Sequence, residues 1–491
     1  MTGAFEAQVQ LLQGTICGVN RDDYRRFCGI PYARQPVGSL RWCAPKPVSP
    51  GRDLIPAENF GPMAPQVLED VKDSGSTSEA CLNLNIWTPR ATTKAPVMVW
   101  IHGGGFCQGS NRIRGSLFAQ SGVVLVAPNY RLGVLGFAAH PLIKDSGANF
   151  GLLDLVQALR WVQENIEQFG GDPSNVTIFG VSAGGAAVNL LMTIPSAEGL
   201  FHKAIAQSGY GTWPLLRGHP AQADPLDILH RASQSAEEST AAVFERAGFE
   251  DPDLASLMNA APERLVGGQR GFQLPIVDGD HVTEEPGVLF EQGRMVSVPY
   301  LTGANSFDGS VMPSYQLEPG AYSVVLDDFS LQWRTLYGAD LDEGETRGIQ
   351  RVFGDERYLL SAALLADAMA KTGEDAFLYY LDITPPGFPE RLGSPHGFDA
   401  FLMFESAALY PESVEAKLGQ NIREAWISFA QSGRPTVISE DDKDWRPIRD
   451  GGAWHHIGGA SGISSSKMNE RLGWLKHRYR ARVAPSVDHA P

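Results

Sequence analysis

The chain alternates short apolar runs with longer segments that are apolar on one side only. Four runs have the length and character of buried strands, at residues 84–87, 97–101, 123–127 and 176–179. Between the last two, residues 152–169 carry apolar positions three and four apart, the spacing of a helix that packs on one side. Because the order strand, helix, strand is typical of parallel pairing, the pattern predicts a mostly parallel sheet flanked by helices.

Three further segments extend this sheet or cover it. Residues 9–60 alternate short β-like segments with turns, which predicts an antiparallel start and therefore a mixed sheet. Residues 212–268 and 322–381 have mostly helical patterns, and we expect them to be cap insertions over the carboxyl edge of the sheet. The sequence thus predicts an α/β protein with a single domain over residues 1–483 and a flexible tail at 484–491.

Composition and charge exclude several classes of protein. With 43 % hydrophobic residues among 491, the chain can build an extensive core. Its net charge of −16 repels nucleic-acid phosphates and anionic membranes, so we expect it to bind neither. No segment approaches the roughly 18 apolar residues of a membrane-spanning helix, and the first residues lack the basic and apolar regions of a secretion signal. We therefore expect a cytoplasmic protein.

The cysteines point to neither disulfides nor a metal. They are odd in number and contain no C-x-x-C pair, which leaves buried free thiols as the expectation for Cys17, Cys28, Cys43, Cys81 and Cys107.

The most informative motif follows the strand-like run at 176–179. Residues 179–185 read FGVSAGG, a G-x-S-x-G turn that opens into a segment of small residues with helical character. Such a turn places its serine in a sharp strand-to-helix corner, where glycines are needed because a β-carbon would collide with the neighbouring strand or helix. The pattern predicts that Ser182 is a nucleophile whose hydroxyl is exposed at a helix N-terminus, a position that favours developing negative charge.

A second motif lies after the strand-like run at 97–101. Residues 102–106 read HGGGF, and consecutive glycines let backbone N–H groups approach a ligand oxygen closely. We expect the amides of Gly104, Gly105 and Ala183 to form an oxyanion hole. Two hydrolase motifs, each after a predicted strand, together indicate an active-serine hydrolase.

A serine nucleophile needs a histidine base and a carboxylate to orient it, and in this class both follow the serine in the chain. His396 is our candidate base, because it lies on a loop between turn residues and precedes an apolar run. The rival pair His455 and His456, beside a tryptophan and between glycines, is interpreted as a surface loop. Asp308 is the candidate acid, since it lies just past a predicted strand at 298–303, where the carboxyl edge of a sheet presents functional groups.

Together these residues resemble the type-B carboxylesterase and cholinesterase family. The resemblance runs almost from end to end and is carried by FCGIPYA at 27–33, EACLNLN at 79–85, NYRLGVLGF at 129–137, NFGLLD at 149–154, WVQENI at 161–166, FGGDP at 169–173 and HGFD at 396–399. It implies an α/β-hydrolase fold with a gorge-like pocket. It also implies a catalytic triad of Ser182, Asp308 and His396, in agreement with the interpretation from the residues alone.

The chain departs from the family pattern at several positions. The family usually has glutamate where Asp308 stands, and commonly a glutamate beside the nucleophile where this chain has Val181. Many members bridge the cysteine at position 81 to a partner that is Ala64 here, which favours a reducing compartment. Ala80 also stands where an acidic residue is usual.

The expected activity is hydrolysis of a small to medium apolar or aromatic ester through an acyl-enzyme, without a cofactor or metal, by a monomer or homodimer. Acyl transfer, or hydrolysis of lactones, carbamates or amides, stays open because one triad serves all of them. A non-catalytic adhesion module is disfavoured by the presence of the serine. We expect pocket walls from Phe106, Phe307 and Phe398, although core packing explains such aromatics equally well. The resemblance adds Ser208, which matches a serine near the family's pocket floor.

Overall fold

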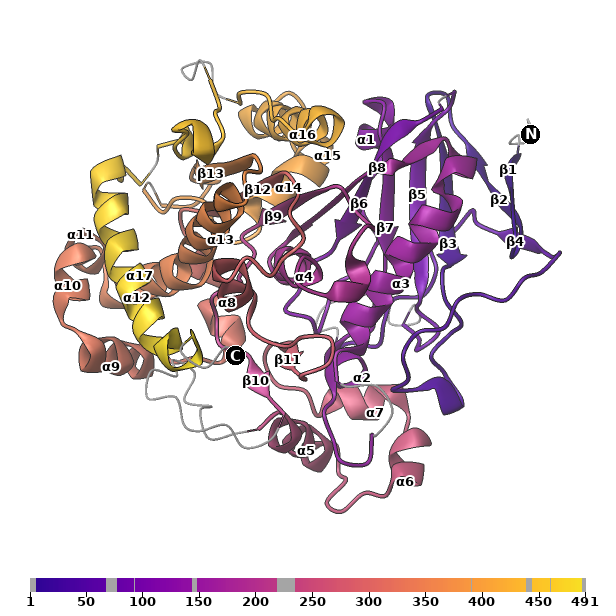
Figure 1. Cartoon of the computed structure of the whole chain (residues 1–491), viewed down its shortest axis with the longest axis horizontal. Coiled ribbons are helices and arrows are strands. Elements are labelled where there is room, and N and C mark those ends of the chain that lie inside the picture. The colour runs from indigo at the N-terminus through magenta and orange to yellow at the C-terminus, as the bar shows by residue number, and fades with distance from the viewer. Residues whose placement is uncertain are drawn as a thin grey trace.

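A sheet of twelve strands forms the centre of the molecule in the computed structural model (Figure 1). The structure describes residues 6–67, 77–91, 93–143, 148–218, 235–389, 391–438, 444–459 and 461–487. The strands pair in the order β1-β2-β3-β5-β7-β6-β8-β9-β12-β13-β14, with β4 beside β2. Their bounds are β1 Glu6–Leu11, β2 Gly14–Asn20, β3 Tyr24–Pro31, β4 Leu54–Pro56, β5 Asn83–Pro89, β6 Ala95–Ile101, β7 Val124–Pro128, β8 Gly171–Val181, β9 Lys203–Gln207, β12 Tyr300–Asn305, β13 Ala376–Asp382 and β14 His455–Gly458.

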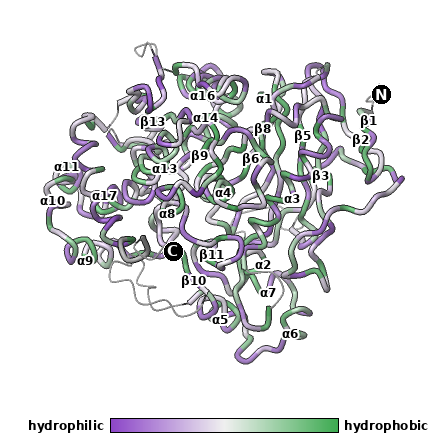
Figure 2. Tube along the Cα trace, in the orientation of Figure 1, coloured by the Kyte–Doolittle hydropathy of each residue, from purple (hydrophilic) through white to green (hydrophobic). Residues whose placement is uncertain are grey.

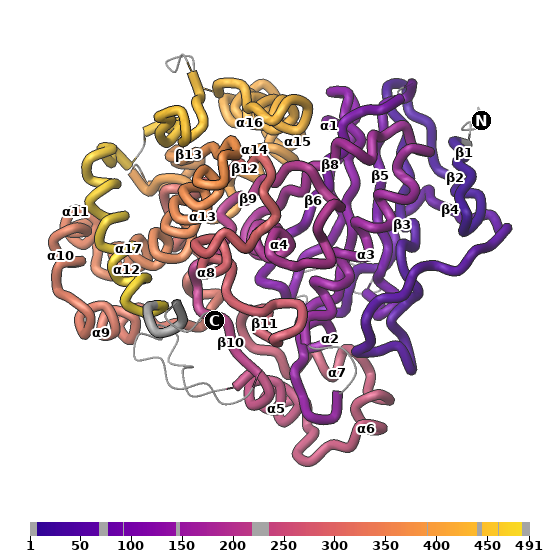
Figure 3. The backbone as a smooth tube through the Cα atoms, viewed as in Figure 1, coloured from indigo at the N-terminus to yellow at the C-terminus, as the bar shows by residue number. Residues whose placement is uncertain are grey.

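The sheet is mixed, as the sequence predicts. The pairs from β1 to β7 along the order are antiparallel, whereas β7, β6, β8, β9, β12, β13 and β14 run parallel to one another. The antiparallel end is built from the N-terminal part of the chain and the parallel end from later segments (Figure 3). The observed sheet and its flanking helices confirm the predicted α/β class.

Both faces of the parallel strands are buried, which explains why these strands read as continuous apolar runs. In β6, Val97 and Val99 pack into one hydrophobic cluster while Met98 and Trp100, which alternate with them, pack into the other. Helices cover the two faces, with α3 (Phe150–Asn165) and α4 (Ala183–Leu191) on one and α16 (Val414–Ser432) on the other. The hydrophobic positions concentrate along the central strands in Figure 2.

The remaining helices lie around the sheet and beyond its carboxyl edge (Figure 1). They are α1 Ser116–Gln120, α2 Gly133–Phe137, α5 Ala236–Arg246, α6 Leu254–Met258, α7 Pro262–Gly267, α8 Pro286–Glu291, α9 Pro319–Phe329, α10 Gln332–Leu336, α11 Gly338–Asp342, α12 Glu345–Gly354, α13 Leu360–Lys371, α14 Phe398–Phe404, α15 Ser406–Leu409 and α17 Ser465–Val487. A two-stranded pair, β10 (Leu216–Arg217) and β11 (Ile276–Val277), lies beside them.

The structure corrects three local expectations. The segment 322–381 is helical only in part, because its end forms β13, whose residues are buried throughout and so show no alternation. His455 and His456 belong to β14 and not to a surface loop, and the His455 ring stacks on Trp445. Residues 484–487 continue helix α17, while 488–491, like 219–234 of the first cap, lie outside the described residues.

Two further findings concern covalent links and membranes. All five cysteines are free, as expected, although Cys43 and Cys107 are only partly buried. Among the helices of the described ranges, none is both long and apolar enough to cross a membrane.

Candidate active site

Ser182 lies at the corner between β8 and α4, as the sequence predicts. Its backbone has φ 57° and ψ −122°, a conformation that non-glycine residues rarely adopt. The corner is held by two backbone hydrogen bonds, from Ser182 N to Gln207 O at 2.9 Å and from Ala186 N to Ser182 O at 2.8 Å. Neighbouring strands therefore keep the serine in its strained position.

The glycines on either side of Ser182 are required by space. A β-carbon on Gly180 would lie 2.6 Å from Ile101 O, and one on Gly184 would lie 2.0 Å from the same atom. A β-carbon on Gly103 would lie 2.7 Å from Val181 O. Because such separations are far below van der Waals contact, the turn is packed tightly against the end of β6 and the HGGG loop.

The structure brings Ser182, His396 and Asp308 into one hydrogen-bonded chain. His396 Nε2 lies 2.7 Å from Ser182 Oγ, and His396 Nδ1 lies 2.7 Å from Asp308 Oδ1. His396 precedes α14, and Asp308 begins the 3-10 helix η5 (Asp308–Tyr315) just after β12. The backbone N–H of His396 also donates to Ser310 Oγ at 2.9 Å, which fixes the histidine loop.

The carboxylate of Asp308 is buried and held from three sides. Beyond His396, its Oδ2 accepts hydrogen bonds from Ser208 Oγ at 2.9 Å and from Asn305 N at 2.8 Å. Burial raises the pKa of Asp308, and the hydrogen bond from His396 opposes that rise. The aspartate, shorter by one methylene than the family's glutamate, thus still reaches the imidazole.

The HGGG loop presents its amides beside Ser182. Gly104 and Gly105 have φ values of 106° and 60°, which favour glycine. The loop is anchored by its carbonyls, because Gly104 O accepts from Gln108 N at 3.0 Å and Gly105 O accepts from Gln273 N at 2.9 Å. The amides of Gly104 and Gly105 donate to no acceptor among the residues that the structure describes. They are therefore available to an oxygen next to Ser182, together with the N–H of Ala183 at the start of α4.

The aromatic residues expected to line a pocket lie in different surroundings. Phe106 is fully buried with its ring against Tyr130 and Phe137, so core packing accounts for it. Phe307 lies under the guanidinium of Arg351, and Phe398 stacks on Phe401. Ser208, in contrast, contacts the proposed acid directly.

Sequence reasoning missed several groups around the site. The Tyr358 ring lies 4.6 Å from the His396 ring, and the Tyr315 and Tyr358 hydroxyls are 3.2 Å apart. Phe272 packs edge-on against Tyr315, with ring centroids 4.8 Å apart. Tyr358 lies in the second expected cap, whereas Phe272 and Tyr315 lie between the two expected caps, and the sequence pattern of these segments does not reveal which side chains face Ser182.

A second group of side chains that the sequence does not reveal supports the turn at Ser182. Asp399 accepts hydrogen bonds from Gln207 Nε2 at 2.9 Å and from Tyr379 Oη at 2.7 Å. Gln207 in turn accepts the N–H of Ser182 through its backbone carbonyl. The HGFD sequence at 396–399 thus contributes both the imidazole and a buried carboxylate that fixes the neighbouring strand end.

A cavity of about 610 Å³ opens beside the HGGG loop. Its wall includes Cys107 and Gln108 from the loop, Phe272, and Pro313 and Ser314 from η5. Burial raises the pKa of the Cys107 thiol to about 11, so this cysteine is not a competing nucleophile at neutral pH. Within the described ranges, no group of three or more histidine, cysteine, aspartate or glutamate side chains is arranged to hold a metal.

The mixed sheet, the strand-to-helix corner at Ser182 and the hydrogen-bonded side chains of Ser182, His396 and Asp308 are those of a serine hydrolase with the α/β-hydrolase fold. The model of the carboxylesterase family matches residues 6–458. Fumonisin B1 esterase of Sphingopyxis macrogoltabida is 34 % identical over 457 residues, which cover 86 % of this chain and 81 % of that protein. Acetylcholinesterase of Bungarus fasciatus is 28 % identical over 476 residues, 85 % of this chain and 76 % of that one.

Solved structures agree with these sequence relatives. A PNB esterase superposes with a TM-score of 0.75 at 28 % identity, covering 95 % of this chain and 99 % of that one. A carboxylesterase of Geobacillus stearothermophilus gives 0.76 at 28 % identity, covering 96 % and 99 %. The chain belongs to the type-B carboxylesterase family and is an ester hydrolase of that family.

Proposed function

We propose that the chain hydrolyses small to medium esters with apolar or aromatic groups through an acyl-enzyme on Ser182. The observation that carries this proposal is the continuous hydrogen-bonded chain from Ser182 Oγ through His396 to Asp308, with both contacts at 2.7 Å. In this arrangement His396 Nε2 accepts the serine proton as the oxygen attacks the ester carbonyl. Asp308 holds the imidazole in the correct orientation and stabilises the imidazolium that forms.

The tetrahedral oxyanion would be stabilised by the amides of Gly104, Gly105 and Ala183. These donors are fixed before the substrate arrives. The HGGG loop is anchored through its carbonyls, and the turn at Ser182 is anchored by its hydrogen bond to the backbone carbonyl of Gln207. Donors that need no rearrangement during the reaction stabilise the transition state more than the ground state. His396 then protonates the leaving alcohol, and in the second half it activates the water that releases the acid.

The aromatic surroundings of the site support an apolar or aromatic group on the substrate. Phe272 lies on Gly105 of the HGGG loop, Tyr358 lies against the His396 ring, and Tyr315 contacts both of these aromatic residues. Aromatic walls bind apolar groups by removing them from water and stack with planar ones. The adjoining cavity of about 610 Å³ lies in the range of small-molecule pockets.

Substitution of Ser182 by alanine tests the proposal. We expect p-nitrophenyl butyrate hydrolysis to fall by more than about 10⁴-fold, because the nucleophile is removed while folding is unaffected. An organophosphate should label the unaltered chain once and S182A not at all, as read by mass spectrometry. Ser121→Ala, a change of an exposed serine outside the site, serves as control. Undiminished turnover by S182A would refute the proposal.

The same assay identifies the acceptor of the acyl group. Products are analysed with p-nitrophenyl butyrate in water and again with a competing alcohol or amine. Free butyrate as the main product in both supports hydrolysis, whereas a dominant new ester or amide identifies acyl transfer.

A further inference from the structure

Arg357 is a fully buried arginine next to the proposed catalytic centre. It lies in the π-helical turn η6 (Asp355–Leu359), which joins α12 to α13. None of its three guanidinium nitrogens makes a well-aligned hydrogen bond to a described residue, although the phenols of Tyr210, Tyr315 and Tyr358 interact with the guanidinium. Burial of an ionised group without a partner is costly, so such a side chain needs a compensating interaction.

Aromatic rings provide part of this compensation. The guanidinium carbon of Arg357 lies 3.9 Å from the ring centre of Tyr210, 4.2 Å from that of Tyr315 and 4.4 Å from that of Trp213. Aromatic faces stabilise a cation above them, but the N–H groups in the plane of the guanidinium still require acceptors. Burial raises the pKa of Tyr210 well above its usual value, so this phenol stays neutral and supplies no counter-charge.

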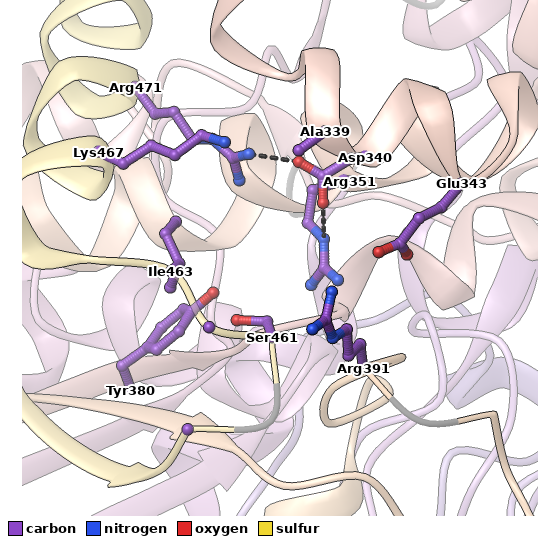
Figure 4. A pocket seen from close by; sticks show the side chains of 12 residues that line it. Ala339, Asp340, Glu343, Arg351, Tyr380, Arg391, Ser461, Ile463, Lys467 and Arg471 are labelled. Carbon is purple, nitrogen blue, oxygen red and sulfur yellow. Dashed lines mark hydrogen bonds and ion pairs between the residues drawn. The ribbon is translucent and has the colours of Figure 1, made fainter.

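Most of the other buried arginines among the described residues have carboxylate partners, whereas Arg423 donates to a backbone carbonyl. Arg131 pairs with Asp154 at 2.7 Å, and Arg478 pairs with Glu356 at 2.7 Å. Figure 4 shows a cationic cavity in which Asp340 lies between Arg351 and Arg471 and contacts both.

The acids nearest to Arg357 in sequence are already engaged. Glu356 pairs with Arg478, and Asp355 contacts Arg471 and the Tyr337 hydroxyl. Arg357 therefore differs from these arginines in being surrounded by neutral rings.

The aromatic residues around Arg357 lead to two parts of the proposed machinery, the His396 ring and the HGGG loop. Tyr358, the next residue, lies against the His396 ring and within hydrogen-bonding distance of Tyr315. Tyr315 contacts Phe272, whose ring lies on Gly105 of the HGGG loop. A series of ring contacts thus connects Arg357 to His396 on one side and to the HGGG loop on the other.

We propose that Arg357 binds a carboxylate carried by the ester substrate, so that the enzyme favours esters with a free acid group at one end. Arg357 supplies the charge and planar N–H donors that match a carboxylate, and Tyr210, whose hydroxyl also makes no well-aligned hydrogen bond in the described part of the chain, can donate a further hydrogen bond. The aromatic rings bind the hydrocarbon between the acid and the ester. This inference rests on the proposed function and specifies its substrate class.

The carboxylate could be part of the acyl group or of the alcohol, and the test separates the two. The first arm uses mono-p-nitrophenyl esters of succinic, glutaric and adipic acid, with p-nitrophenyl butyrate as neutral reference. The second arm uses acetate esters of hydroxybenzoic acids, with phenyl acetate as reference. We expect one arm, and not both, to show a higher kcat/KM for the charged ester.

The decisive variant is Arg357→Met, which replaces the cation by an apolar chain and leaves no charge buried. It should lose about 10-fold to 100-fold in kcat/KM on the preferred charged ester, the size expected for a lost charged hydrogen bond, and change less than about fivefold on the neutral one. Arg423→Met makes the same change at a buried arginine of α16, which donates to Met403 O, and should leave the ratio unchanged.

A second measurement applies if Arg357→Met does not fold. Glutarate should inhibit butyrate hydrolysis by the unaltered enzyme competitively, at concentrations at least about tenfold lower than the neutral diamide glutaramide. Equal inhibition by the two, or an unchanged ratio of charged to neutral turnover in R357M, would overturn the inference while leaving ester hydrolysis intact. Absence of Ser182-dependent turnover on every ester would instead reject the proposed function.

Discussion

The ring of Phe272 lies directly on Gly105, so that a β-carbon on the glycine would lie 2.0 Å from the ring. A residue of the segment after α7 thereby contacts the loop that supplies two of the proposed oxyanion donors. The position of the loop depends on this contact, on the absence of a side chain at residue 105 and on the bond from Gln273 N to Gly105 O. The first two predictions examine the two sides of this contact.

Gly105→Ala should reduce kcat by about 10²–10³-fold, the usual effect of losing one oxyanion donor. The methyl group collides with Phe272, and the φ of 60° is unfavourable for alanine, so the loop must move. Steady-state kinetics on p-nitrophenyl butyrate and thermal unfolding measure the two effects. The double variant G105A/F272A should recover only part of the lost stability and not full turnover, since the collision is removed but the unfavourable φ remains. Wild-type kcat in G105A would show that this amide is not used.

Phe272→Ala should widen the site and shift preference toward bulkier esters. Removal of the ring clears the space over Gly105 and beside Tyr315, at the wall of the cavity next to the loop. We expect the kcat/KM ratio of a naphthyl ester to phenyl acetate to rise about tenfold, equivalent to about 1.4 kcal/mol. Phe388→Ala, at an exposed position, is the matched control and should leave the ratio unchanged. If both variants give the same ratio, Phe272 does not restrict the substrate.

The positions of β6, β8 and their two motifs could be predicted because their signals are local. A continuous apolar run followed by glycines identifies a buried strand and its turn without knowledge of the partners. The chain order of serine, acid and base restricts the candidates to residues after Ser182, and the turn residues around His396 and the strand end before Asp308 then favour these two. Strand β13 was read as helix because its residues are buried on both faces and follow the long helix α13.

The surroundings of the site could not be predicted, because they depend on how distant segments pack. Arg357 lies in the second expected cap, and Phe272 and Tyr315 lie between the two expected caps; the local sequence pattern gives none of them a direction toward Ser182. The sequence does contain one local indication of a buried charge, because three charged residues at 355–357 interrupt an apolar helical stretch. Successive helix positions are about 100° apart, so a buried helix cannot expose all three, and at least one of them is expected inside.

Ser208→Ala should lower kcat by about 10-fold to 100-fold with little change in KM. The hydroxyl donates to the buried carboxylate of Asp308, and loss of a hydrogen bond to a charged group costs about 1.5–3 kcal/mol. The effect reaches the reaction through the orientation of His396, not through substrate contact. Ser310→Ala, which removes only the bond to His396 N, should have a smaller effect. Kinetics on a neutral ester compare them, and equal losses would argue against a special role for Ser208.

The last prediction concerns acid stability and His102, the first residue of the HGGG loop. Burial lowers the pKa of His102 to about 4, and its ring stacks on Tyr130. In the unfolded chain the pKa returns to about 6.5. As pH falls through that value the unfolded state takes up the proton first, so stability is lost between about pH 6.5 and 4.

The His102→Asn variant lacks this titration. Denaturant unfolding at pH 7 and pH 5 should show the free energy of unfolding of the unaltered chain falling by about 2 kcal/mol more than that of the variant. Burial raises the pKa of Asp355 to about 6, so protonation of this residue stabilises the folded state as pH falls. This contribution is the same in both proteins. The difference between their free energies of unfolding therefore reports on His102 alone. If the free energy of unfolding falls equally in the two proteins, burial does not lower the pKa of His102 in the folded state.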